Sequence, residues 1–187
     1  MIDLVITKRT DNRLLDRMKN HYSKPKGFVG RNICYAVMFN DVYYGHVVGG
    51  SASLHLPGRN EYLEVDDINK VVNNIFFNVS KVNGSYPLRN FTTQVIKQFT
   101  EQITNDWFCK YGDEVIGFET LVEPPREGTL YIKAGWSYVG MTKGFTCKRQ
   151  AGDGTDSWSG KRVWNTKELR PKLVFCLRAK RKKNEVN

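Results

Sequence analysis

The chain has 187 residues, of which 40% are hydrophobic and 12% aromatic, and its net charge at pH 7 is +10. This length suits one compact domain with a full hydrophobic core, and this composition excludes a chain that is disordered throughout. No apolar run approaches the roughly 20 residues that span a bilayer. Charges also interrupt the N-terminal segment where a signal peptide needs an apolar stretch. We therefore expect a soluble, cytoplasmic protein with no membrane partner.

The positive charge is concentrated towards the C-terminal end. Between Lys161 and Asn187, ten Lys or Arg residues stand against two Glu, so this segment carries +8 of the net +10. A segregated charge of this kind favours a polyanionic partner, because each neutralised phosphate releases counterions. The alternative is a solvated basic tail that aids solubility.

The cysteines are too far apart for a Cys-x-x-Cys pair, which argues against a zinc knuckle. They are Cys34, Cys109, Cys147 and Cys176. Because a chain of this size with a full core does not need disulfides, we expect reduced thiols that mostly serve packing.

The first part of the chain predicts strands and one helix. We expect strands over residues 2–7, 33–39 and 42–54, a helix over 11–22 that Asp11 caps, and a loop over 23–31. The pair Gly49-Gly50 inside a strand indicates a bulge or the close approach of a ligand.

The rest of the chain predicts an alternation of helices and strands. We expect helices over 66–74, 88–111 and 127–134, strands over 75–80, 115–122, 137–143 and 173–179, and a polar, Gly-rich loop over 149–161. This order indicates a layered α/β domain with a mixed central sheet and helices on both faces. Residues 1–148 form its core, and residues 149–187 add the basic loop, the last strand and the tail to the same domain.

One stretch, GTLYIKAGWSYVGMTKG (128–144), resembles the helix-then-strand segment of the GNAT acetyltransferases. Gly135 can end the helix in a left-handed conformation while Trp136 packs back on it. The resemblance implies a GNAT-like fold, and it implies that Tyr131 meets an acyl-coenzyme A cofactor; the alternative is that Tyr131 and Trp136 are core aromatic residues.

The turn NGSYPLRN (83–90) precedes the long helix. In GNAT acetyltransferases, amides at the start of this helix hold the pyrophosphate of coenzyme A, and unpaired amides with a positive dipole suit an anion. The resemblance therefore implies cofactor binding by Ser85, Tyr86, Arg89 and Asn90. The Gln/Arg-x-x-Gly-x-Gly/Ala motif of the family is absent, so the alternative is a capped helix with a proline near its first turn.

Four segments together resemble the Mom family of DNA-modifying proteins of Mu-type bacteriophages. They are HYSKPKGFVGR (21–31), NKVVNNIFF (69–77), FETLVEPPREGTLYIKAGWSYVGMTKG (118–144) and GKRVWNTKELRPKLVF (160–175), and the first three also resemble an uncharacterised domain of Druantia anti-phage systems. The likeness implies an enzyme that converts adenine in double-stranded phage DNA to an N6-carbamoylmethyl form, which blocks host restriction enzymes. It also raises iron as a metal that the enzyme could require, and it leaves the donor of the carbamoylmethyl group open.

An enzyme that modifies adenine needs particular kinds of residue, and the sequence offers candidates for them. The N6 amine is a poor nucleophile, so an enzyme must extract the base, hold it and remove a proton. Glu119 lies between apolar neighbours of a predicted strand, where a carboxylate is costly unless it is paired or used. We predict that it is a general base or a metal ligand; the alternative is a salt bridge to Arg126 or Lys133.

The densest polar cluster, His21-Tyr22-Ser23-Lys24, lies where a predicted helix ends. His21 is a candidate base or iron ligand, and the alternative is a histidine that interacts with the helix dipole. Tyr22 is a candidate for stacking or for a hydrogen bond in catalysis. Lys24 and Arg31 are candidates for phosphate binding, with solvated loop charges as the alternative.

Small and amide side chains mark two further places. Ser51 and Ser53 follow the glycine pair, and Ser51 is a candidate for catalysis, whereas the alternative is that small residues fill a tight sheet. Asn73 and Asn74 are candidates for reading a base edge, and the alternative is that they satisfy backbone groups at a turn.

The segment GDGTDSWSGKRVWN (152–165) interleaves basic and aromatic residues, a pattern that suits a DNA strand or a flipped base. Asp156 is a candidate for catalysis, and the candidates for nucleic-acid binding are Trp158, Lys161, Arg162, Arg170 and Lys172. The alternative is a surface loop anchored by its tryptophans.

Three functions therefore stand beside one another. The first is hypermodification of adenine in DNA, the second is ordinary GNAT acetyl transfer to a small amine or a protein, and the third is a non-catalytic nucleic-acid-binding module. The charge fits the first and third, whereas Glu119 and the His21 cluster indicate an enzyme.

Overall fold

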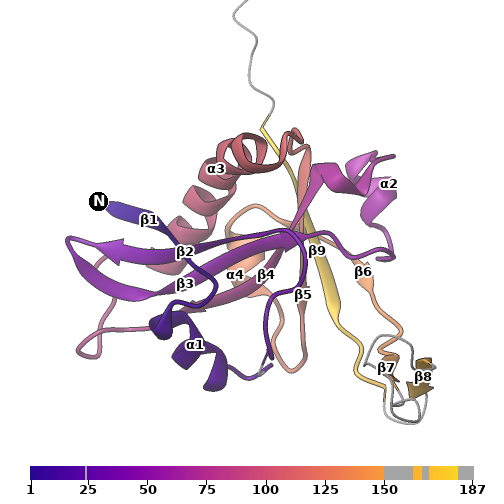
Figure 1. Ribbon diagram of the computed structural model, residues 1–187, viewed down its shortest axis with the longest axis horizontal. Coiled ribbons are helices and arrows are strands. Elements are labelled where there is room, and N and C mark those ends of the chain that lie inside the picture. Colours follow the sequence, from indigo (N-terminus) through magenta and orange to yellow (C-terminus); the bar gives the residue numbers. More distant parts are fainter. Residues whose placement is uncertain (24, 150–161, 166–168, 181–187) are drawn as a thin grey trace, which may run out of the picture.

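The computed structural model in Figure 1 describes residues 1–23, 25–149, 162–165 and 169–180. The first elements are β1 (Ile2–Thr7), α1 (Asn12–Lys19), β2 (Asn32–Phe39), β3 (Val42–Ser51), α2 (Arg59–Leu63) and the 3-10 helix η1 (Ile68–Lys70). The central elements are β4 (Val71–Val79), α3 (Phe91–Tyr111), β5 (Gly117–Val122) and α4 (Thr129–Lys133). The last elements are β6 (Ser137–Met141), β7 (Thr146–Arg149), β8 (Arg162–Asn165) and β9 (Leu173–Arg178).

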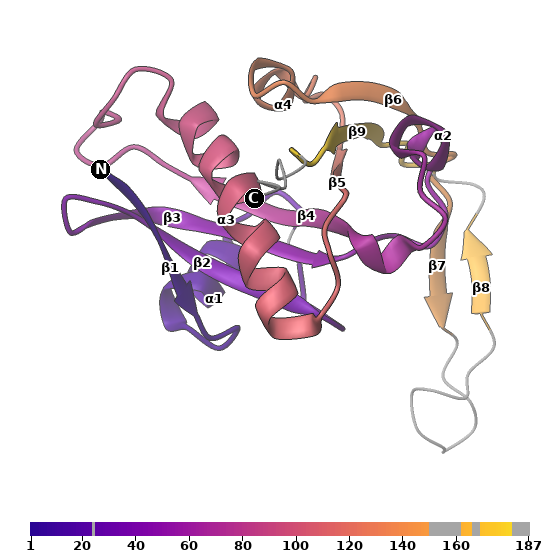
Figure 2. The same cartoon turned by 90° about the horizontal axis from the view of Figure 1, so that it is seen from above.

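Seven strands form one mixed sheet in the order β1-β2-β3-β4-β5-β9-β6. Neighbouring strands are antiparallel except for β4 and β5, which are parallel. The last strand, β9, lies between β5 and β6. The segment before β9 and the segment after it lie at opposite ends of the sheet. Among the described strands, β7 and β8 pair with each other alone, and they project from the sheet as an arm (Figure 2).

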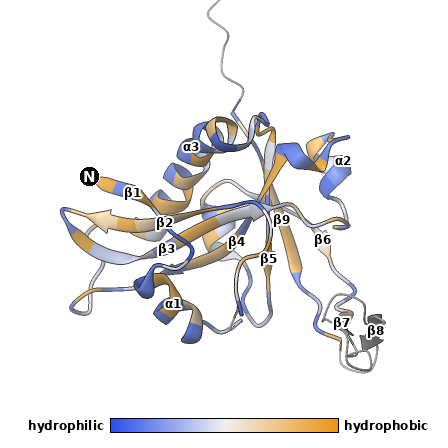
Figure 3. Ribbon diagram, viewed as in Figure 1, coloured by the Kyte–Doolittle hydropathy of each residue, from blue (hydrophilic) through white to orange (hydrophobic). Residues whose placement is uncertain are grey.

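Helices cover both faces of the sheet. On one face, α3 and α4 pack on a core that includes Tyr35, Val47, Phe118 and Phe175. On the opposite face, α1 packs on Cys34, Val48 and Phe76, and α2 packs on Val71, Val174 and Cys176. Hydrophobic residues accordingly follow the central strands in Figure 3, whereas α2 and several turns are hydrophilic. Asp11 begins α1 by accepting hydrogen bonds from the amides of Arg13 and Leu14.

β4 and β5 separate after a short pairing, and this opening shapes the molecule (Figure 1). They are in register only at Val71–Gly117, Val72–Phe118 and Asn73–Glu119. Beyond this point β4 stays with β3, and β5 stays with β9. A bulge lies at the same level, because Val48 pairs with Phe76 and Gly49 with Asn74, which leaves Ile75 as an extra residue in β4.

The structure confirms the predicted fold class, a mixed α/β sheet with helices on both faces. It also confirms the bulge at the glycine pair. A Cβ on Gly49 would lie 2.1 Å from Cδ1 of Ile103, so the group that approaches this glycine closely is helix α3.

Several predicted elements were wrong in kind or extent. The helix expected over 66–74 is a single 3-10 turn at Ile68–Lys70, since Val71–Asn74 pair with β3 and β5 and belong to the sheet. The helix expected from residue 11 to 22 ends at Lys19. The long helix begins at Phe91, because the preceding Asn90 has a left-handed φ of 56°.

Other differences concern elements that the sequence pattern did not predict. These elements are α2, β7 and β8, and most of the predicted loop 149–161 lies outside the described residues. No helix within the described ranges is both long and apolar enough to cross a membrane.

Three cysteines are free thiols: Cys34 and Cys176 are buried and Cys109 is exposed. Burial raises the pKa of Cys34 to about 11 and that of Cys176 to about 12, so neither is a thiolate at neutral pH.

Candidate active site

A cavity of about 170 Å³ lies where β4 and β5 separate, and we call it the wedge cavity. Its lining comes from the turn after α1, from β4, from β5, from α4 and from the segment before β9. The sequence predicts six of its lining residues as site residues: His21, Tyr22, Asn73, Asn74, Tyr131 and Lys172. Ser23, Thr120 and Glu123 also line it. Segments far apart in the chain therefore meet at this one point.

Hydrogen bonds fix the inner wall of the wedge cavity around Asn74. The Tyr131 hydroxyl donates to Oδ1 of Asn74 at 2.7 Å, and Oγ1 of Thr120 donates to the Asn74 carbonyl at 3.0 Å. Nδ2 of Asn74 donates to the carbonyls of Val48 and Phe76, each at 3.2 Å. Burial raises the pKa of Tyr131, so the phenol remains protonated. Because protein groups occupy both ends of the Asn74 amide, the geometry favours a backbone-satisfying role over readout of a base edge.

The outer part of the wedge cavity holds a histidine–serine pair. Nδ1 of His21 lies 2.7 Å from Oγ of Ser23, and the ring of His21 packs against Phe76 with centroids 4.8 Å apart. Burial and the nearby Arg126 charge lower the pKa of His21, while a hydrogen bond to the Phe77 backbone acts in the opposite direction. His21 is therefore a neutral imidazole at neutral pH and is free to accept a proton.

Tyr22 lies beside this pair and is 44% exposed. The guanidinium carbon of Arg126 lies 3.5 Å from the centroid of the Tyr22 ring, a cation–π contact. Burial raises the pKa of Tyr22. The site thus presents an aromatic ring with a positive charge on it at its exposed side.

Glu119 belongs to a second polar cluster, the Glu119 cluster, which consists of Glu119, Arg59, Ser53 and Asn73. Glu119 is 0% and Arg59 1% exposed, and Nη1 of Arg59 donates to Oε2 of Glu119 at 2.6 Å. The other oxygen, Oε1, accepts from the Ser53 amide at 2.6 Å and from Nδ2 of Asn73 at 2.9 Å. Burial raises the pKa of Glu119, whereas the Ser53 amide and the Arg59 guanidinium act in the opposite direction.

Three donors directed at one carboxyl group are the pattern of an ionised, structurally paired glutamate. The geometry therefore favours the salt-bridge alternative for Glu119, with Arg59 as the partner in place of Arg126 or Lys133. Arg59 also donates to the carbonyls of Ser53 and Leu54, so the pair fastens the segment after β3 to β5.

A larger cavity of about 1040 Å³, the outer cavity, adjoins the wedge cavity. Ser23, Leu121, Glu123 and Lys172 line both cavities. The outer cavity is also lined by the cationic residues Arg59, Lys143 and Arg170, and its acidic residues are Glu61 and Glu123. Nζ of Lys172 lies 4.0 Å from a carboxylate oxygen of Glu123.

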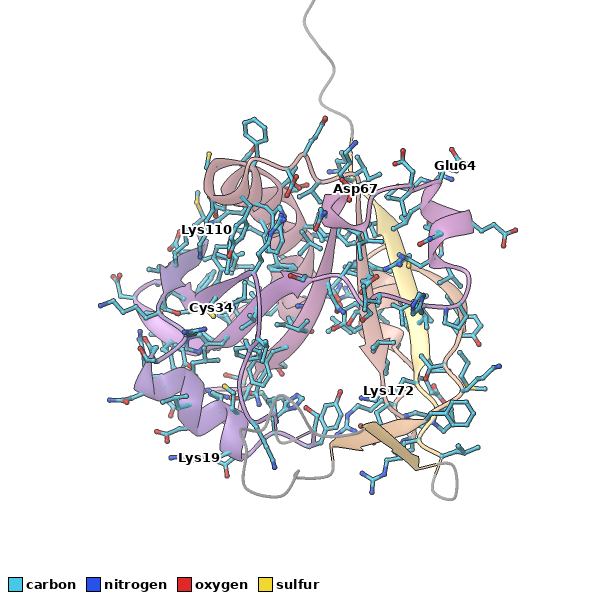
Figure 4. All side chains as sticks on the ribbon, turned by 45° about the vertical axis from the view of Figure 1, so that its right-hand side comes forward. Lys19, Cys34, Glu64, Asp67, Lys110 and Lys172 are labelled. Carbon is cyan, nitrogen blue, oxygen red and sulfur yellow. The ribbon has the colours of Figure 1, made fainter. Side chains whose placement is uncertain are left out.

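The described positive charges of the C-terminal segment fall at the two ends of β9. Arg170 and Lys172 precede the strand and line the outer cavity. Arg178 and Lys180 lie at the other end, where they pair with Glu64 and Glu101 at 2.7 Å each. Figure 4 shows Lys172 and Glu64 at opposite ends of this strand. The described residues of the C-terminal segment therefore do not form a single cationic surface.

Several predicted site residues lie away from both cavities. Arg31 pairs with Asp113 and stacks on the rings of Trp107 and Tyr111 near the end of α3. Ser51 is exposed at the end of β3, where its amide donates to the Arg31 carbonyl.

The predicted cofactor residues in the turn before α3 form a separate group. Ser85 pairs with Val82, the Tyr86 hydroxyl donates to the Val79 carbonyl at 3.2 Å, and Arg89 is exposed. Asn90 precedes α3 without a side-chain capping bond.

Other predicted site residues lie outside the described residues, namely Lys24, Asp156, Trp158 and Lys161, together with the side chain of Arg162 in β8.

The described residues offer no group of three His, Cys, Asp or Glu side chains arranged to hold a metal ion. Among the described residues, the polar groups bonded to His21 are the hydroxyl and amide of Ser23 and the backbone of Phe77, and its other contacts are aromatic rings, a donor set that does not fit iron. We therefore derive no step through a metal.

Sequence reasoning missed Arg59, Lys143 and the importance of Ser23 and Ser53. Arg59 lies in the five-residue helix α2, and nothing in its local sequence distinguishes a buried arginine from a solvated one. Ser23 did have a signal, because it stands two residues after His21 where a helix ends.

No protein-family model and no curated protein matches the sequence. Among solved structures, an acetyltransferase of Bacillus subtilis in complex with CoA is similar, with a TM-score of 0.57 and 13% identity over 95% of this chain and 99% of that chain. An aminoglycoside acetyltransferase in complex with coenzyme A has a TM-score of 0.55 and 15% identity, with 95% of each chain covered. An alanine N-acetyltransferase from Escherichia coli that acts on a ribosomal protein has a TM-score of 0.55 and 9% identity, with 100% of this chain and 99% of that chain covered. With its seven-stranded mixed sheet opening between β4 and β5, the chain has the fold of the GNAT acetyltransferases.

Proposed function

We propose that the chain is a group-transfer enzyme in which an amine accepts an acyl-type group from a coenzyme A thioester. The observation that carries this proposal is the opening between β4 and β5, which pair at three positions only and then enclose the polar wedge cavity. Strands that separate leave backbone N–H and C=O groups unpaired, and an extended ligand that contains amides can pair with them.

The turn before α3 supports the same donor. Helix α3 has 21 residues and no side-chain cap, so the amides at its start are available to an anion such as a pyrophosphate. Arg89 is exposed beside them. In this proposal Ser85, Tyr86, Arg89 and Asn90 hold the pyrophosphate, and the thioester supplies the activated acyl group. Two of the similar structures contain coenzyme A, which supports this choice of donor.

The acceptor cannot be taken from the fold, because similar structures act on acceptors as different as an aminoglycoside and a ribosomal protein. A second, finer proposal is that the acceptor is the N6 amine of adenine in DNA. The observation that favours it is the positive charge of Lys143, Arg170 and Lys172 in the outer cavity, together with the wedge cavity, which Lys172 also lines and where Tyr22 is 44% exposed. An extracted base needs such a stacking surface, and its strand needs such charges.

The donor is tested by isothermal titration of acetyl-CoA into the purified protein, with Arg89→Ala as the variant. We expect saturable binding that weakens about tenfold in the variant, because one charge-assisted contact to a phosphate is lost. Arg13→Ala, at the exposed N-terminus of α1, is the matched control and should bind as the wild type does. Absence of binding to the wild type would refute the proposed donor.

The acceptor is tested by mass spectrometry of nucleosides from plasmid DNA of cells that express the chain. A modified adenine supports DNA as the acceptor, and unmodified DNA from protein that binds acetyl-CoA leaves acyl transfer to another amine. In a binding assay, the double variant Arg170→Ala/Lys172→Ala should lower the slope of log K against log salt by about 2, one for each phosphate contact. Arg178→Ala/Lys180→Ala removes the same charge at the other end of β9 and should leave the slope unchanged.

A further inference from the structure

We infer that Ser23 is an acyl-accepting nucleophile that His21 activates, and that it passes the acyl group from the wedge cavity to the outer cavity. The relay between cavities rests on the proposed acyl transfer, whereas the nucleophilic character of Ser23 does not. Acyl transfer on this fold needs no such intermediate in principle, so the inference adds a covalent step to the proposed function.

The first support is the geometry of the pair. Oγ of Ser23 lies 2.7 Å from Nδ1 of His21, which is the separation of a hydroxyl that donates to a neutral imidazole. Nδ1 also accepts from the backbone N–H of Ser23 at 3.3 Å, so both polar groups of Ser23 orient the ring, and a backbone hydrogen bond of Phe77 raises the pKa of His21. A nucleophile, a base and a third group that orients the base are the three components of an activated hydroxyl.

The second support is the position of the pair. Ser23 lines both cavities and is exposed, so reagents can reach its hydroxyl from either side. His21 lines the wedge cavity, where it packs on Phe76 and on Tyr22. Lys172 lines both cavities as well, with its Nζ 4.0 Å from a carboxylate oxygen of Glu123, so the cavities that Ser23 adjoins contain a positive charge that could stabilise a developing oxyanion.

The protonation state of His21 agrees with this role. Burial and the charge of Arg126 lower the pKa of His21. The described charged and titratable groups around it are Arg126, Tyr22, Glu123, Tyr131 and Lys172. A histidine that is neutral at pH 7 accepts a proton from the hydroxyl, whereas an imidazolium cannot.

The step balances with an ester or thioester as the acyl donor. A bond forms between Oγ of Ser23 and the carbonyl carbon, and the bond from that carbon to the leaving oxygen or sulfur breaks. The Ser23 proton moves to Nδ1 of His21 and then to the leaving group, which departs as an alcohol or thiol. In the second half, the acceptor amine attacks the Ser23 ester, its proton passes to His21, and the Ser23 oxygen leaves with that proton as a hydroxyl.

The test uses the full-length protein and p-nitrophenyl acetate, an activated ester that does not require coenzyme A. We expect a burst of one nitrophenol per chain and a mass increase of one acetyl group, which peptide mapping places on Ser23. Ser23→Ala should abolish this adduct, and His21→Gln should slow its formation about 100-fold, because the general base is lost. Ser80→Ala is the matched control, since the Ser80 hydroxyl contacts Arg17 at 2.5 Å and has a cation in place of a base.

Wild-type protein without a burst, or an adduct that survives Ser23→Ala, overturns the inference. Titration of Ser23→Ala with acetyl-CoA separates this outcome from failure of the proposed function. If the wild type forms no acetyl adduct but both proteins bind acetyl-CoA, the covalent step is refuted and the proposed donor stands. If acetyl-CoA does not bind while p-nitrophenyl acetate acetylates Ser23, the nucleophile stands and the proposed donor is refuted.

Discussion

Two polar clusters meet at the point where β4 and β5 separate, and they differ in what their members contact. In the Glu119 cluster, both carboxylate oxygens are occupied by Arg59, Ser53 and Asn73, and the ion pair is almost completely buried. Around His21, the exposed Ser23 lines both cavities and the exposed Tyr22 lines the wedge cavity. The first cluster is closed and the second is open.

The difference shows how a polar residue in a predicted strand should be interpreted. A carboxylate among apolar neighbours requires partners, and it becomes a candidate for chemistry only when those partners leave room for a ligand. Glu119 meets the requirement with protein groups alone. We therefore expect the closed cluster to contribute to stability and the open one to chemistry, and removing members of each cluster tests this expectation.

The largest effect is expected in the closed cluster. Arg59→Met should lower the free energy of unfolding by about 3–5 kcal/mol, because it leaves the buried Glu119 carboxylate without its counterion. Urea unfolding followed by circular dichroism measures this change. The double variant Arg59→Met/Glu119→Gln should be more stable than Arg59→Met, since a neutral amide replaces the unpaired charge. A loss below about 1 kcal/mol in Arg59→Met would mean that the cluster is not part of the scaffold.

A buried histidine far from both clusters gives the next largest effect and depends on pH. His46 is 0% exposed, and its Nδ1 lies 2.6 Å from the Tyr43 hydroxyl. Burial lowers its pKa from 6.5 to about 4. Between these values the unfolded chain binds the proton and the folded chain does not, so stability falls as the pH falls from about 6.5 to 4, by up to about 3 kcal/mol.

Unfolding free energies of the wild type and His46→Gln across this range isolate the contribution. The variant should lose the part of the pH dependence that His46 causes. The raised pKa of Glu119 acts with the opposite sign, since a carboxyl group with a raised pKa in the folded state favours folding at low pH. Parallel curves for the two proteins would contradict the prediction.

Tyr131 tests the distinction between the two clusters. It lines the wedge cavity, but its hydroxyl is hydrogen-bonded to a buried protein group, as the members of the Glu119 cluster are. Tyr131→Phe removes the donor to Oδ1 of Asn74 and leaves a buried acceptor unpaired, which should cost about 1–3 kcal/mol. Tyr138→Phe is the matched control, since Tyr138 is 55% exposed and the change should fall within about 0.5 kcal/mol. Equal stability of the two variants would place Tyr131 with the open cluster.

Much of the fold could be predicted from the sequence because it depends on local patterns. Asp11 marks the start of α1, and the apolar spacing along α3 and the apolar runs of β2 and β9 can be recognised from the local sequence alone. The segment from Val71 to Asn74 was misassigned, because two asparagines disfavour a strand and only the pairing with β3 and β5 outweighs that preference.

The site could be predicted in part. Six wedge-cavity residues were identified because the resemblance and the polar clusters mark them, yet their division into two clusters depends on which face of a strand each occupies. Asn73 and Asn74 are adjacent, but one bonds to Glu119 and the other to Tyr131. The partner of Glu119 is 60 residues away on a helix that no pattern predicted, so this contact is a property of the tertiary structure.

The smallest stability effect gives the most direct comparison of the two clusters, because a serine hydroxyl is removed from each. Ser53→Ala deletes the acceptor of a 3.2 Å hydrogen bond from Nδ2 of Asn73 and should lower the free energy of unfolding by about 1 kcal/mol. Ser23→Ala deletes a hydroxyl on an exposed residue and should change it by less than about 0.5 kcal/mol. Reactivity towards p-nitrophenyl acetate should show the reverse order, with the Ser23 variant inactive and the Ser53 variant near the wild type. If Ser23→Ala instead unfolds at markedly lower urea while Ser53→Ala loses the acetyl adduct, the roles of the two clusters are exchanged, and the covalent step belongs to the segment after β3.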